Sequence, residues 1–293
     1  MSKKEISKQK KDFEEIRLKK NIEDFVKNNA KEIKKIVKID PDGKKMQIDV
    51  LSALNVAIKM PGVRIDRKKF FITEMKKDFD KKTIDEAIEF NPAYAGISVN
   101  KITKIANSTI VYERNKVSLI SFAAGLPGGF AMIPAITCDL VQYFVHVLRI
   151  VQKLIYLYGF DELNFDENEI DSETMNKILI FVGAMYGVEG AARGIKILAQ
   201  AVQTKVTKNL ARVALTKTMI YPIIKKILSA LGIRVTKQIF ANAVGKIVPI
   251  IGGFVSGGLT FVTFGTNCNA LKKTLSKNAI ANPKTYKKLK EKK

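Results

Sequence analysis

A polar stripe runs along one face of an otherwise apolar segment in the middle of this 293-residue chain. Its members recur at steps of three or four residues, which places them within about 100° of arc on an α-helix. Such a face could line a polar cavity, with Asp139 as a base or ligand anchor and with Arg149 and Lys153 holding an anion. The stripe consists of Asp139, Gln142, His146, Arg149, Lys153 and Tyr156.

A structural interpretation of the same stripe stays open beside the chemical one. Asp139 and His146 are seven residues apart, about 10 Å along a helix axis, so they cannot bond each other directly. A buried charge must be paired. The stripe would then pack against a polar face of another helix, with Asp139 paired to a Lys or Arg from the basic C-terminal half. Replacing Asp139 would in that case reduce stability rather than activity alone.

The elements that must position the stripe are helical, and the sequence predicts an all-α fold. A helix over residues 135–158 carries the stripe itself. Asp66 is a plausible N-cap for a helix over residues 66–79, and Asp171 or Ser172 begins another. That later helix contains glycines at spacings of three and four, which would let a neighbouring helix approach closely. These glycines are Gly183, Gly187, Gly190 and Gly194.

The composition divides the chain into four parts. Residues 1–45 are expected to form an exposed charged helix, and residues 46–115 a small N-terminal helical module that begins with a helix over residues 46–59. Residues 116–276 form a Gly-rich multi-helix core domain. Residues 277–293 are a basic tail that is expected to fray.

Two uncharged runs, Val117–Cys138 and Ile247–Leu271, reach the length of a membrane span. Each contains Pro and several Gly, and basic residues flank both ends of the second run, which therefore shows no inside–outside bias. Such interrupted runs are typical of buried helical hairpins or of shallow or re-entrant segments. Whether they enter lipid is left open.

Charge is distributed unevenly. The net charge is +23, and the residues from Gly190 onward contain 20 Lys and Arg but a single acid, Glu291. This asymmetry concerns partners rather than fold, and it predicts an anionic partner such as a membrane surface, or else nucleic acid. A basic coat that serves solubility is the alternative. The residues expected to contact an anionic surface are Lys225, Lys226, Arg234, Lys237, Lys246, Lys272 and Lys273.

Familiar catalytic and metal-binding motifs are missing from the sequence. It contains no P-loop, no nucleophile elbow and no H-E-x-x-H pair. The acidic segment 161–173 lacks the central Gly of an EF-hand loop. Cys138 and Cys268 do not indicate a disulfide framework, which suits a reducing compartment. We therefore expect no catalytic residues, metal or cofactor, and the sequence favours a non-enzymatic protein without deciding the question.

Residues 115–275 resemble the EcsC family of bacterial proteins. The shared features are a Pro-Gly-Gly break, a small-residue run with Pro, an Asp before an apolar helix, and a Tyr-Gly-Phe close. The Gly-rich segment Ile247–Gly265 is similar as well. The resemblance implies an all-helical, membrane-associated bacterial protein, and it supplies no catalytic residues. Here the motifs are Pro127-Gly128-Gly129, Pro134, Asp139 and Tyr158-Gly159-Phe160.

The leading hypothesis from the sequence is a cytoplasmic protein, peripheral to the inner face of the cell membrane, that binds an anionic lipid surface through its basic helical domain. A nucleic-acid-binding protein using the same basic half is one alternative. Against this alternative, the basic half lacks aromatic residues interleaved with the basic ones, and it contains no recognised nucleic-acid-binding module. A small-molecule-binding protein or enzyme using the stripe is the other. A protein partner stays unknown.

Overall fold

The computed structural model describes residues 36–39, 46–124, 132–165, 170–208, 220–232 and 249–290, together with Lys20, Asp24 and Asn28. These segments confirm the all-α fold, to which a single two-stranded ribbon is added. Strands β1 (Val37–Ile39) and β2 (Met46–Ile48) pair antiparallel, with Val37 opposite Ile48. The prediction of a helix over residues 1–45 is therefore wrong at residues 37–39, which form a strand. The helix predicted over residues 46–59 begins four residues later than expected, at Val50.

Three short helices follow the ribbon: α3 (Val50–Ile58), α4 (Arg67–Met75) and α5 (Lys81–Glu89). An aspartate caps each of them, and the Asp66 carboxylate accepts a hydrogen bond from the Lys69 amide at 2.8 Å, as the sequence predicts. Arg67 joins α4 to α5 by donating to the carbonyls of Ala87 (3.1 Å) and Phe90 (3.0 Å). Helices α3 and α4 pack on α7, so the N-terminal module lies directly on the core.

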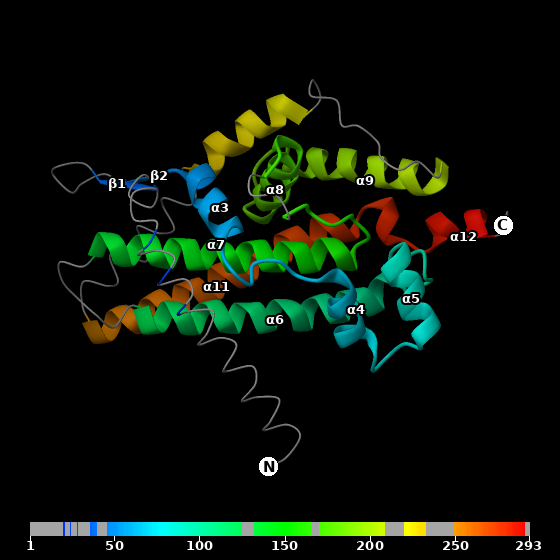
Figure 1. The fold of residues 1–293 in the computed structure, drawn as a ribbon, viewed down its shortest axis with the longest axis horizontal. Coiled ribbons are helices and arrows are strands. Elements are labelled where there is room, and N and C mark those ends of the chain that lie inside the picture. The colour runs from blue at the N-terminus through cyan, green and yellow to red at the C-terminus, as the bar shows by residue number, and fades with distance from the viewer. Residues whose placement is uncertain are drawn as a thin grey trace, which may run out of the picture.

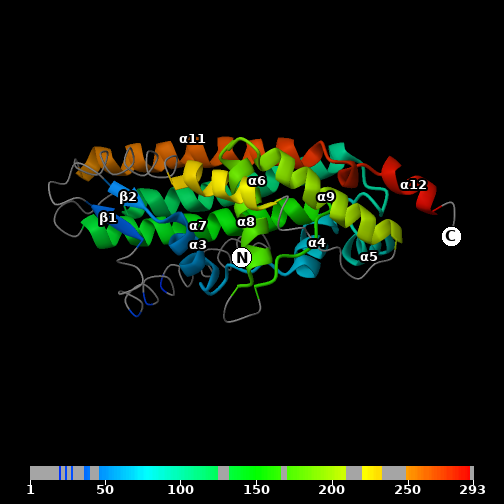
Figure 2. The ribbon, with the colours of Figure 1, turned by 90° about the horizontal axis from the view of Figure 1, so that it is seen from above.

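Three long helices form the centre of the molecule (Figure 1): α6 (Val99–Ala124), α7 (Met132–Leu157) and α11 (Pro249–Ser276). Helix α7 lies between α11 on one side and α3 and α4 on the other (Figure 2). Helix α6 crosses residues 115 and 116 without interruption, so the N-terminal module and the core domain meet within one helix. Helix α11 is likewise continuous, so the second uncharged run does not fold as a hairpin.

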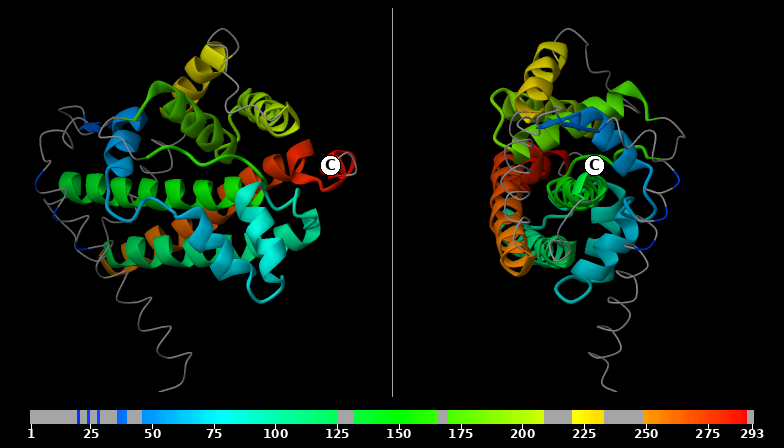
Figure 3. Two further views of the ribbon diagram at one scale, coloured as in Figure 1. Left: turned by 45° about the vertical axis from the view of Figure 1, so that its right-hand side comes forward. Right: turned by 90° about the vertical axis from the view of Figure 1, so that its left-hand side faces the viewer.

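Helices α8 (Ser172–Met185), α9 (Ala191–Lys208) and the helix over residues 220–232 lie together on one side of the three long helices (Figure 3). The prediction of a single helix over α8 and α9 is wrong, because Gly187 (φ 64°) and Gly190 (φ 90°) adopt the left-handed conformation and turn the chain. The expected close approach holds for the other two glycines. A Cβ at Gly183 would lie 3.0 Å from Ile227, and one at Gly194 would lie 3.0 Å from Ile180.

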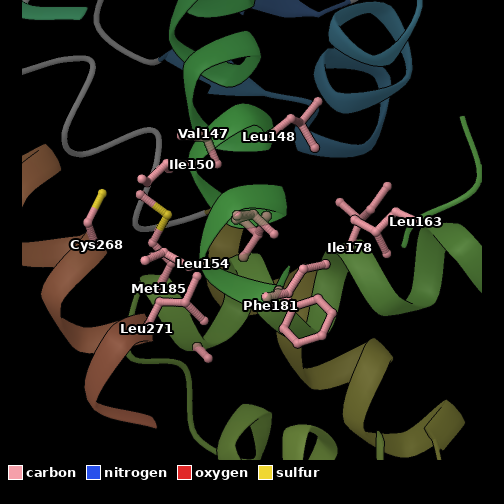
Figure 4. Packing of buried hydrophobic residues seen from close by; sticks show 14 of the residues in the cluster. Val147, Leu148, Ile150, Leu154, Leu163, Ile178, Phe181, Met185, Cys268 and Leu271 are labelled. Carbon is pink, nitrogen blue, oxygen red and sulfur yellow. The ribbon is translucent and has the colours of Figure 1, made fainter. Parts of the chain in front are cut away.

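The core is centred on α7. Leu148, Ile150 and Leu154 of this helix are fully buried. Figure 4 shows α7 side chains facing Phe181 and Met185 of α8 and Cys268 and Leu271 of α11, with Leu163 beside α8. Among the described residues, only the segment Leu140–Leu157 of α7 has the length and apolarity of a membrane span, and 94% of it is buried inside the protein. The apolar surface of that segment is therefore covered by protein here.

The segment after α11 does not fray, contrary to expectation. It contains a 3₁₀ turn, η1 (Ala279–Ala281), and helix α12 (Lys284–Lys290). Ile280 is fully buried and Tyr286 is 1% exposed. The Asn91 side chain donates to the Tyr286 hydroxyl at 3.2 Å, which joins this segment to the N-terminal module. Two large apolar anchors in a basic segment are enough to keep it on the core.

The N-cap at Asp171 allows a direct test of local stability. Its carboxylate accepts hydrogen bonds from the Thr174 amide (2.8 Å) and the Thr174 hydroxyl (2.9 Å), which satisfies an otherwise unpaired amide in the first turn of α8. We expect Asp171→Ala to lower the free energy of unfolding by about 1 kcal/mol in urea denaturation. Asp171→Asn preserves capping and serves as the matched control. Equal losses in both variants would contradict the assignment of this cap.

Candidate functional site

Most of the described polar stripe faces protein rather than a solvent-filled cavity. Helix α7 positions the stripe, and its polar members are almost completely covered: His146 is 1% exposed, Lys153 7% and Tyr156 1%. Two groups accept their hydrogen bonds, namely one carboxylate of α6 and the backbone of residues 62–65. The stripe therefore connects three parts of the fold.

The carboxylate belongs to Glu113 of α6, which is fully buried. Ile102, Ile105, Thr109 and Val117 are also buried, and their spacing places them on the same side of α6 as Glu113. Helix propensity and the apolar neighbours thus bring an acid into the contact between α6 and α7, which pack side by side. An unpaired carboxylate in that position would be strongly unfavourable.

Three bases of α7 surround this carboxylate at successive turns. His146 Nδ1 lies 2.9 Å from Glu113 Oε2, and Lys153 Nζ lies 2.5 Å from Oε1. Arg149 Nε lies 3.6 Å from Oε1, and its side chain is 19% exposed. The Lys153 ammonium also lies over the rings of Tyr112 (5.2 Å) and Phe70 (5.9 Å). We call Glu113, His146, Arg149 and Lys153 the buried charge cluster.

The electrostatics of the cluster favour an ionised acid. Burial by itself raises the pKa of Glu113, but Lys153, Arg149 and the hydrogen bond from His146 outweigh it and hold this pKa well below its ordinary value. Burial lowers the pKa of Lys153, and the attraction of Glu113 offsets this only in part. The cluster thus contains a carboxylate whose charge depends on its neighbours.

The same face of α7 holds the segment between α3 and α4. The Arg149 guanidinium donates to the Gly62 carbonyl. Gln152 accepts from the Ile65 amide at 3.0 Å and donates to the Val63 carbonyl at 2.8 Å. The Tyr156 hydroxyl donates to the Ile65 carbonyl at 3.3 Å. Residues 62–65 lie outside helices and strands, so their backbone groups need other hydrogen-bond partners. The polar side chains of α7 supply these partners.

The structure settles only part of the predicted pairing. The backbone of Asp139 lies in α7, but its side chain, and with it the predicted pairing to a base of the C-terminal half, lies outside the described residues. Gln142 Oε1 and His146 Nε2 are buried without a hydrogen-bond partner in the part of the chain that the structure describes. Among the described residues, the acid that pairs with the bases of the stripe is Glu113 of α6.

Sequence reasoning missed Glu113 and Gln152. A signal for Glu113 was present, because it and Asp139 are the only acids in residues 90–160. A lone acid within a helix of apolar periodicity is a candidate partner for bases on a neighbouring apolar helix. Gln152 lies between Arg149 and Lys153 in the sequence and on the same face as Tyr156, so the stripe itself pointed to it.

The predicted anion-binding lysines lie on two described elements. Lys225 and Lys226 are exposed on the 220–232 helix, where Lys226 pairs with Glu189 at 2.8 Å. On α11, Lys273 is exposed, whereas Lys272 is half-buried and donates to Asn107. Arg234, Lys237 and Lys246 lie outside the described residues. Three of the seven therefore point into solvent in the described part of the chain.

Comparison with family models, with curated proteins and with solved structures gives no match to this chain. Within the described ranges, no three His, Cys, Asp or Glu side chains are grouped so that they could hold a metal ion. The described contacts neutralise the Glu113 charge and link α6, α7 and the segment before α4.

Proposed function

We propose that this chain is a non-enzymatic protein that associates peripherally with an anionic membrane surface, at the cytoplasmic face of a bacterial cell, through its basic Gly-rich helical domain. The observation that carries this proposal is the charge of the C-terminal part, with 20 bases and one acid from Gly190 onward. Each Lys or Arg close to an anionic bilayer contributes about 1 kcal/mol to binding. A few of them are sufficient for recruitment.

The outer face of the 220–232 helix has the composition of a membrane-interface surface. Its buried face comprises Ile224, Ile227 and Leu231, which pack into the core. Beside this face, Tyr221 is 71% exposed and Lys225 follows one turn later, also exposed. Tyr and Lys together are enriched where proteins meet the headgroup region, since the ring is amphipathic and the ammonium contacts phosphate.

The stripe on α7 supports the non-enzymatic part of the proposal. His146, Arg149, Lys153 and Tyr156 bind Glu113 or the backbone of residues 62–65, so these four members already make structural contacts. The resemblance of residues 115–275 to the EcsC family agrees with a membrane-associated helical protein.

The test is flotation of the purified full-length protein with liposomes at low and high salt. We expect recovery with anionic liposomes, little recovery with neutral ones, and loss of binding at high salt because the charges are exposed and therefore screened. The triple variant Lys225→Glu/Lys226→Glu/Lys273→Glu should reduce recovery on anionic liposomes roughly tenfold or more. Lys272 is left unchanged, because it is half-buried as well as bonded to Asn107, and its reversal would test packing; the ion pair of Lys226 with Glu189 is exposed and contributes little to stability.

A matched control reverses the same number of charges elsewhere. Lys76 and Lys77 are exposed directly after α4, and Lys81 is exposed at the start of α5, all in the N-terminal module. Their reversal changes the net charge by the same amount and should leave most of the binding intact. Equal recovery of wild type and the 225/226/273 variant would refute the proposal. Salt-sensitive binding to DNA or RNA but not to lipid would instead favour the nucleic-acid alternative.

A further inference from the structure

A groove of about 480 Å³ lies between α9 and the segment where α11 ends. Its α9 wall is one helix face, with residues at steps of three and four. The opposite wall is formed by the end of α11 and by η1, which packs against α9. The lining residues are Ala192, Lys196, Ala199, Gln200, Gln203, Thr274, Lys277, Asn278 and Ala279.

The groove combines positive charge with an apolar floor. Lys196 and Lys277 are exposed ammonium groups contributed by the two walls, and neither forms an ion pair with another residue that the structure describes. Among the described residues, no acid lines the groove. The lining also includes the methyl groups of Ala192, Ala199 and Ala279, and the amides of Gln200 and Gln203 supply further donors.

The wall formed by the end of α11 is held in place from behind. Asn278 Nδ2 donates to the carbonyls of Thr274 (2.8 Å) and Leu275 (3.3 Å), which completes the C-terminal turn of α11. Ile280 is fully buried, one residue beyond the lining. Because this wall is already ordered, less conformational entropy is lost when a ligand binds.

The groove also lies near the surface proposed to face the membrane. It begins at Ala192, two residues after the Gly190 turn, and Ile223 of the 220–232 helix lies 4.0 Å from the position of a Cβ at Gly190. Helix α9 and the 220–232 helix lie on the same side of the long helices (Figure 3). A lipid at that surface could therefore reach the groove while the exposed lysines remain on the bilayer.

We propose that this groove binds the phosphate headgroup of an anionic phospholipid, with Lys196 and Lys277 on the phosphate and the alanines against the glycerol and upper acyl carbons. This inference rests on the proposed membrane association. The volume of the groove lies within the usual range for small-molecule sites. The absence of aromatic side chains among the lining residues disfavours a nucleotide base, which would gain from stacking.

The test uses dihexanoyl phosphatidic acid, a soluble lipid kept below its micellar concentration, and isothermal titration calorimetry with the full-length protein. Wild type should bind it saturably at one site. Lys196→Gln/Lys277→Gln should weaken binding roughly tenfold or more. Ala192→Trp, which fills the groove without changing its charge, should do the same and should leave flotation with anionic vesicles largely intact. Lys225→Gln/Lys273→Gln removes equal charge outside the groove and should bind the soluble lipid like wild type.

Different failures have different meanings. The groove proposal is overturned if all variants bind the soluble lipid with equal affinity. It is also overturned if wild type binds vesicles but shows no saturable binding of the soluble lipid. Either result leaves the proposed function standing. Glycerol phosphate bound as tightly as the lipid would overturn the lipid assignment in favour of a free phosphate ester. If wild type binds neither vesicles nor soluble lipid, both proposals fail.

Discussion

Replacing Glu113 by Gln is expected to lower the free energy of unfolding by about 3–5 kcal/mol, the cost of removing one partner from a buried ion pair. The substitution keeps the shape of the side chain but removes its charge. Lys153 would be left 7% exposed, next to Arg149 and without a described acid at contact distance. Urea denaturation of wild type and variant measures the difference.

Two further variants separate charge from shape. Glu113→Gln/Lys153→Met removes the carboxylate together with its most closely bound base and should recover much of the loss, because an apolar side chain of similar length needs no counter-charge. Glu89→Gln changes an exposed acid at the end of α5 and should cost little. A loss below about 0.5 kcal/mol for Glu113→Gln alone would contradict the structural role assigned to the cluster.

The pH dependence follows from the direction of the shift. The folded-state pKa of Glu113 lies well below its ordinary value of 4.5. The carboxylate therefore contributes stability that is fully present above pH 4.5 and is lost as the pH falls through the folded-state pKa. The difference in melting temperature between wild type and Glu113→Gln should be constant near neutral pH and should shrink on acidification below that value.

Replacing Gly159 by Ala is expected to lower the free energy of unfolding by about 2–4 kcal/mol. Gly159 follows α7 with φ 91°, in the left-handed region that disfavours a side chain. A Cβ there would also lie 3.0 Å from the Ile280 carbonyl oxygen and 3.4 Å from Asn91 Cγ. Both neighbours belong to the junction that holds η1 and α12 on the core, so the backbone on both sides would have to move.

Gly96 provides the matched control for this variant. Its φ is 81°, but nothing lies within 4 Å of the position of its Cβ. Gly96→Ala should therefore show the conformational penalty alone, about 1–2 kcal/mol. Hydrogen exchange at residues 279–290 should accelerate in Gly159→Ala and not in Gly96→Ala. Equal destabilisation of the two variants would show that the contact with Ile280 carries no energy.

Local signals in the sequence were sufficient for most helices. Asp66 and Asp171 preceded helices that they cap, because capping involves residues within three positions of each other. The stripe was recognised from its period, and α7 carries it as expected. Glycine was harder to interpret. Gly183 and Gly194 serve close packing, whereas Gly187 and Gly190 form a turn, and identical residues at similar spacing do not show which role each will take.

The sequence by itself determined the all-α fold, the N-caps, the polar face of α7 and the concentration of positive charge after Gly190, since each follows from composition or from residues close in the chain. Only the tertiary structure decided what that polar face meets. Glu113 and His146 are 33 positions apart, and Tyr286 reaches Asn91 across 195 positions. The burial of the segment after α11 likewise depends on surfaces formed by distant helices. Such contacts depend on how helix axes cross, and no local pattern specifies that geometry.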